Sequence, residues 1–544
     1  MACGGLMVKA STSFQCRAYQ TAASENGGEK SARKLRAVVV GGGWAGFGAA
    51  HTLAKAGVEV TLLDAALSPG GLSTGFRSAK GKPVEAGIKG FWWQYRNIFS
   101  LIKELGISWP FTNWTRSSFY NASGIQVEAP VFNELPRLPT PLGSLVYTSP
   151  YFRSLSVLDR LSALPLVKAL IEYDVDEKAY MSYDFMTARQ LFREGGISAR
   201  LYTDFLEPFL LVTLFASPEK LSAAAALGTL YYYALAHQQD FDVCWCKGPV
   251  AELIFIPWIH EIERLGGSIL QGIYVQDVVP CDNSDRITSV IAVNKRGDAE
   301  LYNADVVVFA VGVKAMQKIV ASSMTLEAHD EFVSASNIGS IDVMAIRLWF
   351  DAMIPLQNPS NVLAGIGPGV GATLFDLNAL QEEFSTDMGS VMEVDLYHAN
   401  PFIPLSDNMV IEKIMKYLIQ CDSRFGNAQI IDSSVLRYKE AVTLFGPGSH
   451  QYMASTETSF SNVFIAGDWL KQGPGSHGAR GLSQEKAYVS GLIAANAAAR
   501  YLGIDFHVDI INTEEDEPHV AAAKYMVREM RKTAQNLGID YPFL

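Results

Sequence analysis

The sequence predicts an α/β fold with an inserted, mixed α+β domain that includes a helical lobe. Three observations predict it. A short β-branched strand, a glycine-rich turn and a helix occupy residues 36–56, and a second strand follows at 59–63. A long helical stretch then covers about residues 151–239, and strand patterns return at 269–279, 287–294 and 305–311. Alternating strands and helices are typical of an α/β core, and the long helical stretch between them indicates an inserted lobe.

Composition limits the classes of function that the chain can have. Of its 544 residues, 49% are hydrophobic and 18% are charged, which allows a large buried core and excludes a mainly disordered chain. The formal net charge of −12 gives no attraction for phosphate backbones, so no nucleic-acid partner is expected. The six cysteines and nine histidines are scattered without metal-ligand spacing, so no metal site is expected. No apolar run is long enough to span a bilayer.

The two ends of the chain differ from the rest. Residues 1–24 contain no acidic residue and only two charged ones, Lys9 and Arg17, among many hydroxyl groups. We therefore expect residues 1–34 to be an organellar transit peptide and linker, with an ordinary disordered N-terminus as the alternative. The tail, residues 506–544, carries an acidic turn at 514–517 and a charged helix at 521–537, which we expect to be a solvated surface element.

The strongest local motif is the glycine-rich turn after the first strand. Gly41, Gly43 and Gly46 form G-x-G-x-x-G between a strand and a helix, and Asp64 ends the next strand 23 residues after Gly41. Such glycines allow a tight turn, the close approach of a pyrophosphate and close helix packing, and the acid accepts hydrogen bonds from ribose hydroxyls. The motif predicts a Rossmann-like dinucleotide site but does not separate FAD from NAD.

Two further segments favour a flavin. Residues 68–74 form a second glycine-rich turn after the acidic strand, and residues 463–469 form a buried strand that ends in Gly467-Asp468. A carboxylate at that place can hold a ribityl chain, and the following helix can stabilise negative charge on a reduced flavin.

With these segments the chain resembles the FAD-dependent amine oxidase superfamily and, within it, the plant and cyanobacterial phytoene and zeta-carotene desaturases. The resemblance covers about residues 36–501 and includes the motifs at 87–97, 215–224, 247–252, 446–449 and 483–491. It implies a glutathione-reductase-like flavoprotein. The FAD-binding domain would be discontinuous, built from residues 35–112, 245–320 and 445–505. The substrate-binding domain would comprise residues 113–244 and 321–444.

The resemblance also implies a set of cofactor contacts. Asp64 resembles the ribose ligand, Val275 a backbone contact to adenine and Asp468 the ribityl ligand, while Glu485 lies in the helix start beside the isoalloxazine and pyrophosphate. The whole implied set is Gly41, Gly43, Trp44, Ala45, Gly46, Asp64, Ala65, Gly70, Gly71, Leu72, Gly87, Ile88, Val275, Gly467, Asp468, Glu485 and Ala487.

Three positions depart from the family pattern. Leu72 replaces an arginine beside the phosphates, a loss for which Arg77 could substitute. Lys89 replaces a histidine on the segment facing the flavin. It is the candidate catalytic residue, with a surface-turned lysine as an equal alternative. Lys486 replaces a glycine at the start of the C-terminal flavin helix.

The resemblance implies an FAD-dependent oxidoreductase that removes hydride from a lipophilic polyene, or isomerises it, with a quinone or oxygen as electron acceptor. Apolar stretches at 205–215 and 230–235 could line the substrate site, and residues 136–158 and 161–170 could contact a membrane without spanning it. The leader would direct the protein to the chloroplast. One alternative is an amine oxidase with an aromatic cage from Trp93, Tyr95 or Trp469. The other is a non-catalytic flavoprotein that acts as an assembly factor.

Overall fold

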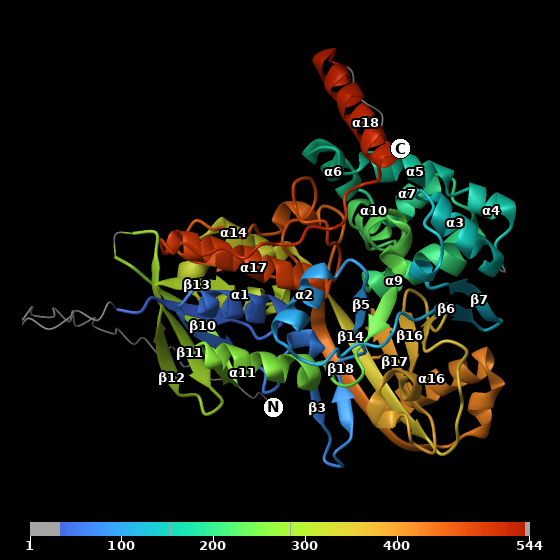
Figure 1. Cartoon of the computed structure of the whole chain (residues 1–544), viewed down its shortest axis with the longest axis horizontal. Coiled ribbons are helices and arrows are strands. Elements are labelled where there is room, and N and C mark those ends of the chain that lie inside the picture. The colour runs from blue at the N-terminus through green and yellow to red at the C-terminus, as the bar shows by residue number, and fades with distance from the viewer. Residues whose placement is uncertain (1–32, 153, 283, 539–544) are drawn as a thin grey trace, which may run out of the picture. The chain divides into compact units, whose positions relative to one another are not determined.

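A computed structural model describes residues 33–152, 154–282 and 284–538 (Figure 1). All the elements described below lie within residues 35–538. The predicted transit peptide and linker therefore lie almost wholly outside the described residues.

A five-stranded parallel sheet forms the centre of the cofactor half. Its strands, in spatial order, are β19 (Val463–Ile465), β13 (Val306–Phe309), β1 (Arg36–Val40), β2 (Glu59–Asp64) and β9 (Ser268–Gln271). The β-branched residues of β1 and β13 are almost fully buried, as expected for strands covered on both faces. All five strands lie inside the three segments predicted to form the FAD-binding domain, although the exact domain limits remain predictions.

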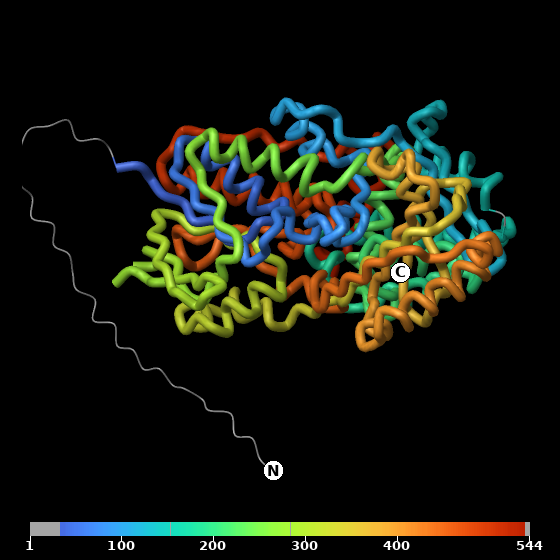
Figure 2. The backbone as a smooth tube through the Cα atoms, turned by 90° about the horizontal axis from the view of Figure 1, so that it is seen from below, coloured from blue at the N-terminus to red at the C-terminus, as the bar shows by residue number. Residues whose placement is uncertain are grey.

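Helices α1 (Trp44–Lys55) and α17 (Gln484–Tyr501) cross closely beside this sheet. A Cβ atom added to Gly491 would lie 2.1 Å from the carbonyl oxygen of Ala45, so only glycine allows this approach. Helix α1, in blue, and helix α17, in red, therefore lie side by side in Figure 2. Helices α11 (Ile256–Arg264) and α2 (Arg96–Glu104) pack against α1 and α17 respectively.

Two further sheets extend the fold. A three-stranded antiparallel sheet contains β10 (Ile273–Pro280), β11 (Ile287–Asn294) and β12 (Ala299–Asn303). A seven-stranded mixed sheet is the main sheet of the substrate half. Its strands, in spatial order, are β18 (Ile430–Leu444), β14 (Gly339–Phe350), β17 (Val391–Tyr397), β16 (Gly371–Asp376), β15 (Ser360–Leu363), β6 (Ser117–Asn121) and β7 (Gly124–Ala129). A short hairpin pairs β3 (Gly75–Arg77) with β4 (Pro83–Glu85). A separate two-stranded antiparallel sheet pairs β5 (Gly90–Trp92) with β8 (Val243–Trp245), which follows much later in the chain.

The predicted helical lobe is present. It contains α3 (Leu142–Thr148), α4 (Val157–Leu161), α5 (Leu164–Glu172), α6 (Glu177–Asp184), α7 (Ala188–Glu194), α8 (Ala199–Leu201), α9 (Glu207–Thr213) and α10 (Ala223–Leu230). The chain breaks before Pro165, and that proline occupies the first turn of α5, where no backbone N–H is needed. Helix α10 continues into a π-helical turn, Tyr231–Leu235.

Six further α-helices lie within the described residues. They are α12 (Val313–Ser322), α13 (Met324–Glu327), α14 (Asp330–Ser334), α15 (Leu377–Leu380), α16 (Asp407–Cys421) and α18 (Pro518–Asn536). The fold class predicted from the sequence, an α/β core with a mixed α+β insertion, is confirmed.

Two details of the prediction are wrong. The pattern at 269–279 is not one strand, because Gly272 adopts a φ of +72° and the chain passes from β9 in the parallel sheet to β10 in another. The tail is not merely a solvated element, since α18 packs on α5 and Arg531 is buried in an ion pair with Asp176.

Candidate functional site

The first glycine bend joins β1 to α1 at the carboxyl edge of the parallel sheet. Gly41 has a φ of +110°, and a Cβ there would lie 2.4 Å from the carbonyl oxygen of Ala310. A Cβ on Gly46 would lie 1.8 Å from the carbonyl oxygen of Gly41, whereas one on Gly43 would meet only the Cα of Gly71, at 3.9 Å. The chain's own packing thus requires the first and third glycines. The second leaves backbone open to a ligand.

The second glycine turn lies directly against the first. Gly70 and Gly71 both adopt positive φ angles, and the N–H of Gly70 donates to the carbonyl oxygen of Gly42 at 2.8 Å. The indole Nε1 of Trp44 donates to Ser73 Oγ at 2.9 Å, which fixes the two turns together. The predicted contacts at 41–46 and 70–72 therefore lie in one place, as the sequence implied.

The side chain of Trp44 packs in the core, so only its backbone is available to the site. Its ring lies against four other aromatic rings: Phe91, Phe255, Trp258 and Tyr488. Trp44 and Ala45 can therefore contribute only backbone N–H groups at the helix start, where the helix dipole favours negative charge.

Asp64 ends β2 beside these turns. Its Oδ1 accepts from the N–H of Ala66 at 3.2 Å, while its Oδ2 is buried and receives no hydrogen bond of good geometry. Burial raises the pKa of Asp64, against the nearby N–H groups of Ala66, Gly42 and Ala65. Such an orphaned acceptor is costly, so the position is suited to a ligand that brings hydroxyl donors.

Arg77 does not take the place of the family's arginine, whose position is occupied by Leu72 in this chain. Its guanidinium pairs with Glu252 at 2.8 Å and with Glu383 at 2.9 Å in the β3–β4 region. The side chain of Leu72 is 39% exposed at the turn. A phosphate at this site would therefore rely on backbone N–H groups and the α1 dipole.

The second half of the site lies after β19, where Gly467 has a φ of +147° and its N–H donates to Ser490 Oγ at 2.8 Å. Burial raises the pKa of the neighbouring Asp468 carboxyl, and the Lys486 ammonium opposes that rise. Lys486 Nζ donates to the carbonyl oxygens of Asp468 and of Leu470, and burial lowers its pKa to about 7. The departure at Lys486 thus places a buried amine on the turn that carries the predicted ribityl ligand.

Glu485 is buried at the start of α17 and has a role that the sequence did not predict. Its carboxylate accepts from Asn97 N at 2.8 Å, from Asn97 Nδ2 at 2.7 Å and from Ile98 N at 3.0 Å. It therefore caps the first turn of α2, and burial raises its pKa to about 7. Any contact of this residue or of Ala487 with a cofactor would come through the α17 backbone.

The segment 87–89 lies over buried carboxylates of the seven-stranded sheet. The N–H of Ile88 donates to Asp395 Oδ2 at 2.9 Å, and a Cβ on Gly87, whose φ is +91°, would lie 2.8 Å from the same oxygen. Lys89 Nζ donates to the carbonyl oxygens of Ala86 and Gly87. Burial lowers the pKa of Lys89, opposed by Asp395 and more distant carboxylates. Lys89 is therefore turned inward, and its catalytic role stays a prediction.

Asp395 is a residue that the sequence analysis missed. A signal was available, since Glu393 and Asp395 are two carboxylates on one face of an otherwise apolar strand, β17. Tyr95, named above for an aromatic cage, and Tyr233, in the stretch 230–235, form a pair that the sequence did not predict: their hydroxyls lie 3.3 Å apart, both beside Ser483, the N-cap of α17.

Val275 lies on β10, where the pairing with β11 shifts register between Val275 and Asp277. Such a bulge leaves backbone groups unpaired, as a backbone contact to a ligand requires. The predicted adenine contact stays a prediction.

Comparison with known proteins agrees with this geometry. The model of the flavin containing amine oxidoreductase family matches residues 44–499. This chain belongs to that family. Among its relatives, a probable zeta-carotene desaturase of Synechococcus elongatus is 21% identical and is aligned over 85% of this chain and 98% of its own length. A 15-cis-phytoene desaturase of an Oncidium hybrid cultivar is 22% identical over 86% of this chain and 78% of its own.

Among solved structures, cyclohexylamine oxidase from Brevibacterium oxydans superposes with a TM-score of 0.61 at 15% identity, covering 87% of this chain and all of that one. At this identity the likeness shows the shared fold. The chain is thus an FAD-dependent oxidoreductase with a carotene-desaturase-like sequence.

The residues of this family member fit FAD. The open face of Gly43 leaves room for a pyrophosphate, and the orphaned Oδ2 of Asp64 can accept from ribose hydroxyls. Asp468 lies on the turn after β19 at the same sheet edge. When bound, FAD would supply the hydride acceptor, and these residues would hold and orient it. Over residues 33–152, 154–282 and 284–538, no group of three or more His, Cys, Asp or Glu side chains could hold a metal ion.

Asp64→Asn tests the ribose contact. We expect the affinity for FAD to fall about 10- to 100-fold, because a charged acceptor is replaced by a neutral one. Titration of apoprotein with FAD, followed by quenching of flavin fluorescence, measures it. Glu59→Gln, an exposed position on the same strand, is the control. Equal affinities for the native protein and the Asp64 variant would contradict the assignment.

Lys486→Met tests the buried amine in apoprotein. Between about pH 7, the pKa in the folded chain, and pH 10.5, its ordinary value, the unfolded chain binds more protons at Lys486. The free energy of unfolding of the native protein, relative to the variant, should therefore rise with pH in that range, by at most about 1.4 kcal/mol per pH unit. Urea unfolding at several pH values measures it. Lys471→Met, an exposed residue of the same loop, should show no such trend, and a flat difference for Lys486→Met would refute burial of the amine.

Proposed function

We propose that this flavoenzyme removes hydride from a lipophilic polyene, or isomerises it, and passes the electrons of the oxidative reaction to a quinone or oxygen. The main support is the alignment of more than four-fifths of the chain with zeta-carotene and phytoene desaturases. A zeta-carotene desaturase of Solanum lycopersicum is aligned over 81% of the chain.

The interior of the lobe supports an apolar substrate. A file of aromatic rings in mutual contact runs from the lobe toward the start of α17, with centroid separations between 4.9 and 6.3 Å: Phe152, Phe205, Phe209, Phe241, Trp92 and Tyr233. Tyr233 meets Tyr95 beside Ser483, close to the predicted flavin turn. Rings of this kind provide the apolar walls that exclude water and orient a long hydrocarbon.

The protein's own side chains need to supply only one chemical step, the removal of a proton. In a desaturation, one carbon loses a hydride and its neighbour loses a proton as the new double bond forms. Lys89 Nζ is the group we propose to take that proton, because burial holds its pKa below the ordinary value. The aromatic file then serves to position the reacting carbons and to exclude water.

An exposed apolar face on the lobe supports delivery of the substrate from a membrane. Helices α3, α4 and α5 carry a cluster of apolar side chains that are 37–78% exposed: Leu142, Leu145, Val146, Val157, Leu158, Leu161, Leu164 and Val167. Clustered exposed apolar residues mark binding surfaces. We propose that this face lies in one leaflet; none of the described helices has the length and apolarity to cross a bilayer.

Location in the chloroplast is part of the same proposal. The plant desaturases that align with this chain are named as chloroplastic enzymes. The leader at residues 1–34 is basic and rich in hydroxyl groups, as organellar transit peptides are.

Anaerobic mixing of FAD-loaded protein with phytoene or zeta-carotene in detergent tests the reaction. We expect loss of the flavin absorbance, recovery on adding a quinone, and a product with one more double bond by mass spectrometry. Bleaching by putrescine or an aromatic amine alone would favour an amine oxidase. Bleaching by dithionite and by none of these compounds would favour a non-catalytic flavoprotein. Product of unchanged mass with altered double-bond geometry would identify isomerisation.

Leu158→Glu with Leu164→Glu tests the membrane face. The pair should abolish flotation with liposomes of chloroplast-like lipids, since each charge must leave water to enter the leaflet. Met388→Glu, at a residue 91% exposed outside this face, is the matched control and should float as the native protein does. Unchanged flotation of the double variant would refute the assigned face.

A further inference from the structure

A polar cavity of about 280 Å³ lies between the lobe, the loop after Asp468 and the C-terminal segment. It borders the aromatic file, since the ring of Tyr232 on its wall lies 4.6 Å from that of Tyr233, centroid to centroid. The lobe contributes Tyr173, Tyr231 and Tyr232, and the loop after Asp468 contributes Arg480. Residues 513–516 and Lys524, which lie beyond the family match at 44–499, contribute a further part of the wall. The cavity is therefore completed by a segment that the family pattern does not include.

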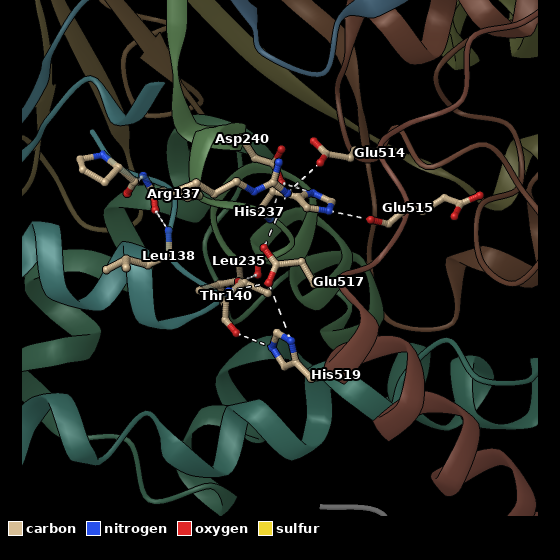
Figure 3. A network of polar contacts seen from close by, with 12 residues as sticks. Arg137, Leu138, Thr140, Leu235, His237, Asp240, Glu514, Glu515, Glu517 and His519 are labelled. Carbon is tan, nitrogen blue, oxygen red and sulfur yellow. Dashed lines mark hydrogen bonds and ion pairs between the residues drawn. The ribbon is translucent and has the colours of Figure 1, made fainter. Parts of the chain in front are cut away.

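We call residues 512–538 the strap. Its first part is bound to the lobe by polar contacts (Figure 3). Glu514 pairs with Arg137 at 2.7 Å, and His237 Nε2 lies 2.8 Å from the carbonyl oxygen of Glu515. Glu517 Oε2 accepts from the N–H of Thr140 at 3.0 Å.

Lys524, on α18, connects the strap to the lobe at the cavity wall. Its Nζ lies 3.0 Å from Asp516 Oδ2 and 3.6 Å from Asp174 Oδ1, and 4.3 Å from the ring centroid of Tyr231. The lysine side chain is only 13% exposed. A charged group held by two carboxylates and an aromatic face stabilises one position of the helix.

The segment before the strap is anchored differently. Val508 and Ile510 pack against the main core, and the backbone of Val508 makes two hydrogen bonds with the side chain of Asn496. On α18, by contrast, Tyr525, Met526 and Met530 are each more than half exposed. Apolar contacts with the core, together with hydrogen bonds from the side chains of Asn496 and Asn97, hold residues 504–511. Residues 512–524 of the strap are held to the lobe mainly by polar contacts, and a segment held in this way opens locally at lower cost. The end of α18 is held more firmly, because Arg531 is buried in its ion pair with Asp176.

We propose that the strap opens and closes the cavity, with Lys524 as its latch. The lining is polar and charged, so the cavity admits small polar molecules from water rather than a polyene. It reaches Tyr232, which lies beside Ser483 at the start of α17. The strap therefore gates a polar route toward the cofactor turns. This inference stands on contacts of the apoprotein and holds whatever the substrate of the flavin is.

Access of a small thiol reagent to a cysteine in the cavity tests the gate in the full-length protein. Ala236 lines the cavity and is 8% exposed, so A236C is a suitable probe. Peptide mass spectrometry reads its labelling rate separately from that of the native cysteines. We expect labelling of A236C/K524M to be about tenfold faster than that of A236C, because the latch no longer limits opening. A236C/K532M is the control. Lys532 pairs with Glu529 on the same helix, and both side chains are exposed.

Equal labelling rates in the three proteins would overturn the proposal, and so would rapid labelling of A236C alone. Hydrogen exchange in the proteins without the cysteine gives a second measurement. The amide of Glu514, bonded to Gln94 Oε1, should exchange about tenfold faster in K524M than in the native protein or K532M. Unchanged exchange at Glu514 in K524M would overturn the proposal even if A236C fails to fold.

Discussion

Parallel pairing of strands from opposite ends of the chain is the constraint on which the cofactor site depends. In the order β19-β13-β1-β2, every strand runs in the same direction, so their carboxyl ends meet at one edge. Gly41, Asp64 and Gly467 each stand at such an end. The glycine turns and Asp64, all within residues 41–71, thus share one sheet edge with the Gly467-Asp468 turn, which lies about 400 residues later in the chain. The close packing of α1 against α17 at Gly491 fixes these two helices beside the sheet.

A second constraint joins the cofactor half to the seven-stranded sheet. Arg347 on β14 is buried between Glu85, at the end of β4, and Glu393 on β17. Next to it, Asp395 holds the N–H of Ile88, and Lys89 lies close by. Burial raises the pKa values of Glu85 and Asp395, so the cluster favours retention of protons on its carboxyls. The position of Lys89 is therefore set by strands of the substrate half, and a change there would reach the predicted flavin face.

Local chemistry explains which parts of this molecule the sequence could predict. The glycine turn and Asp64 depend on neighbouring residues, and the structure has them where the sequence placed them. The roles of Arg77 and Glu485 depend on partners far along the chain. Two glutamates hold Arg77 away from the glycine turn, and the N-terminus of α2 occupies the Glu485 carboxylate. A pattern of residue types reveals neither partner, because register and sheet order decide which distant groups meet.

The tail is a second example of contacts that its sequence does not predict. Its acidic turn and charged helix have the composition of a solvated surface, yet Asp516 and Lys524 lie against the lobe. The difference lies in the kind of contact. The core between α1, α17 and the sheet is apolar and closely packed, so separating it would expose many buried side chains at once. The contacts between lobe and strap are mainly ion pairs and hydrogen bonds, which water can replace. Stability is therefore uneven, and the parts most easily separated are those that border the polar cavity.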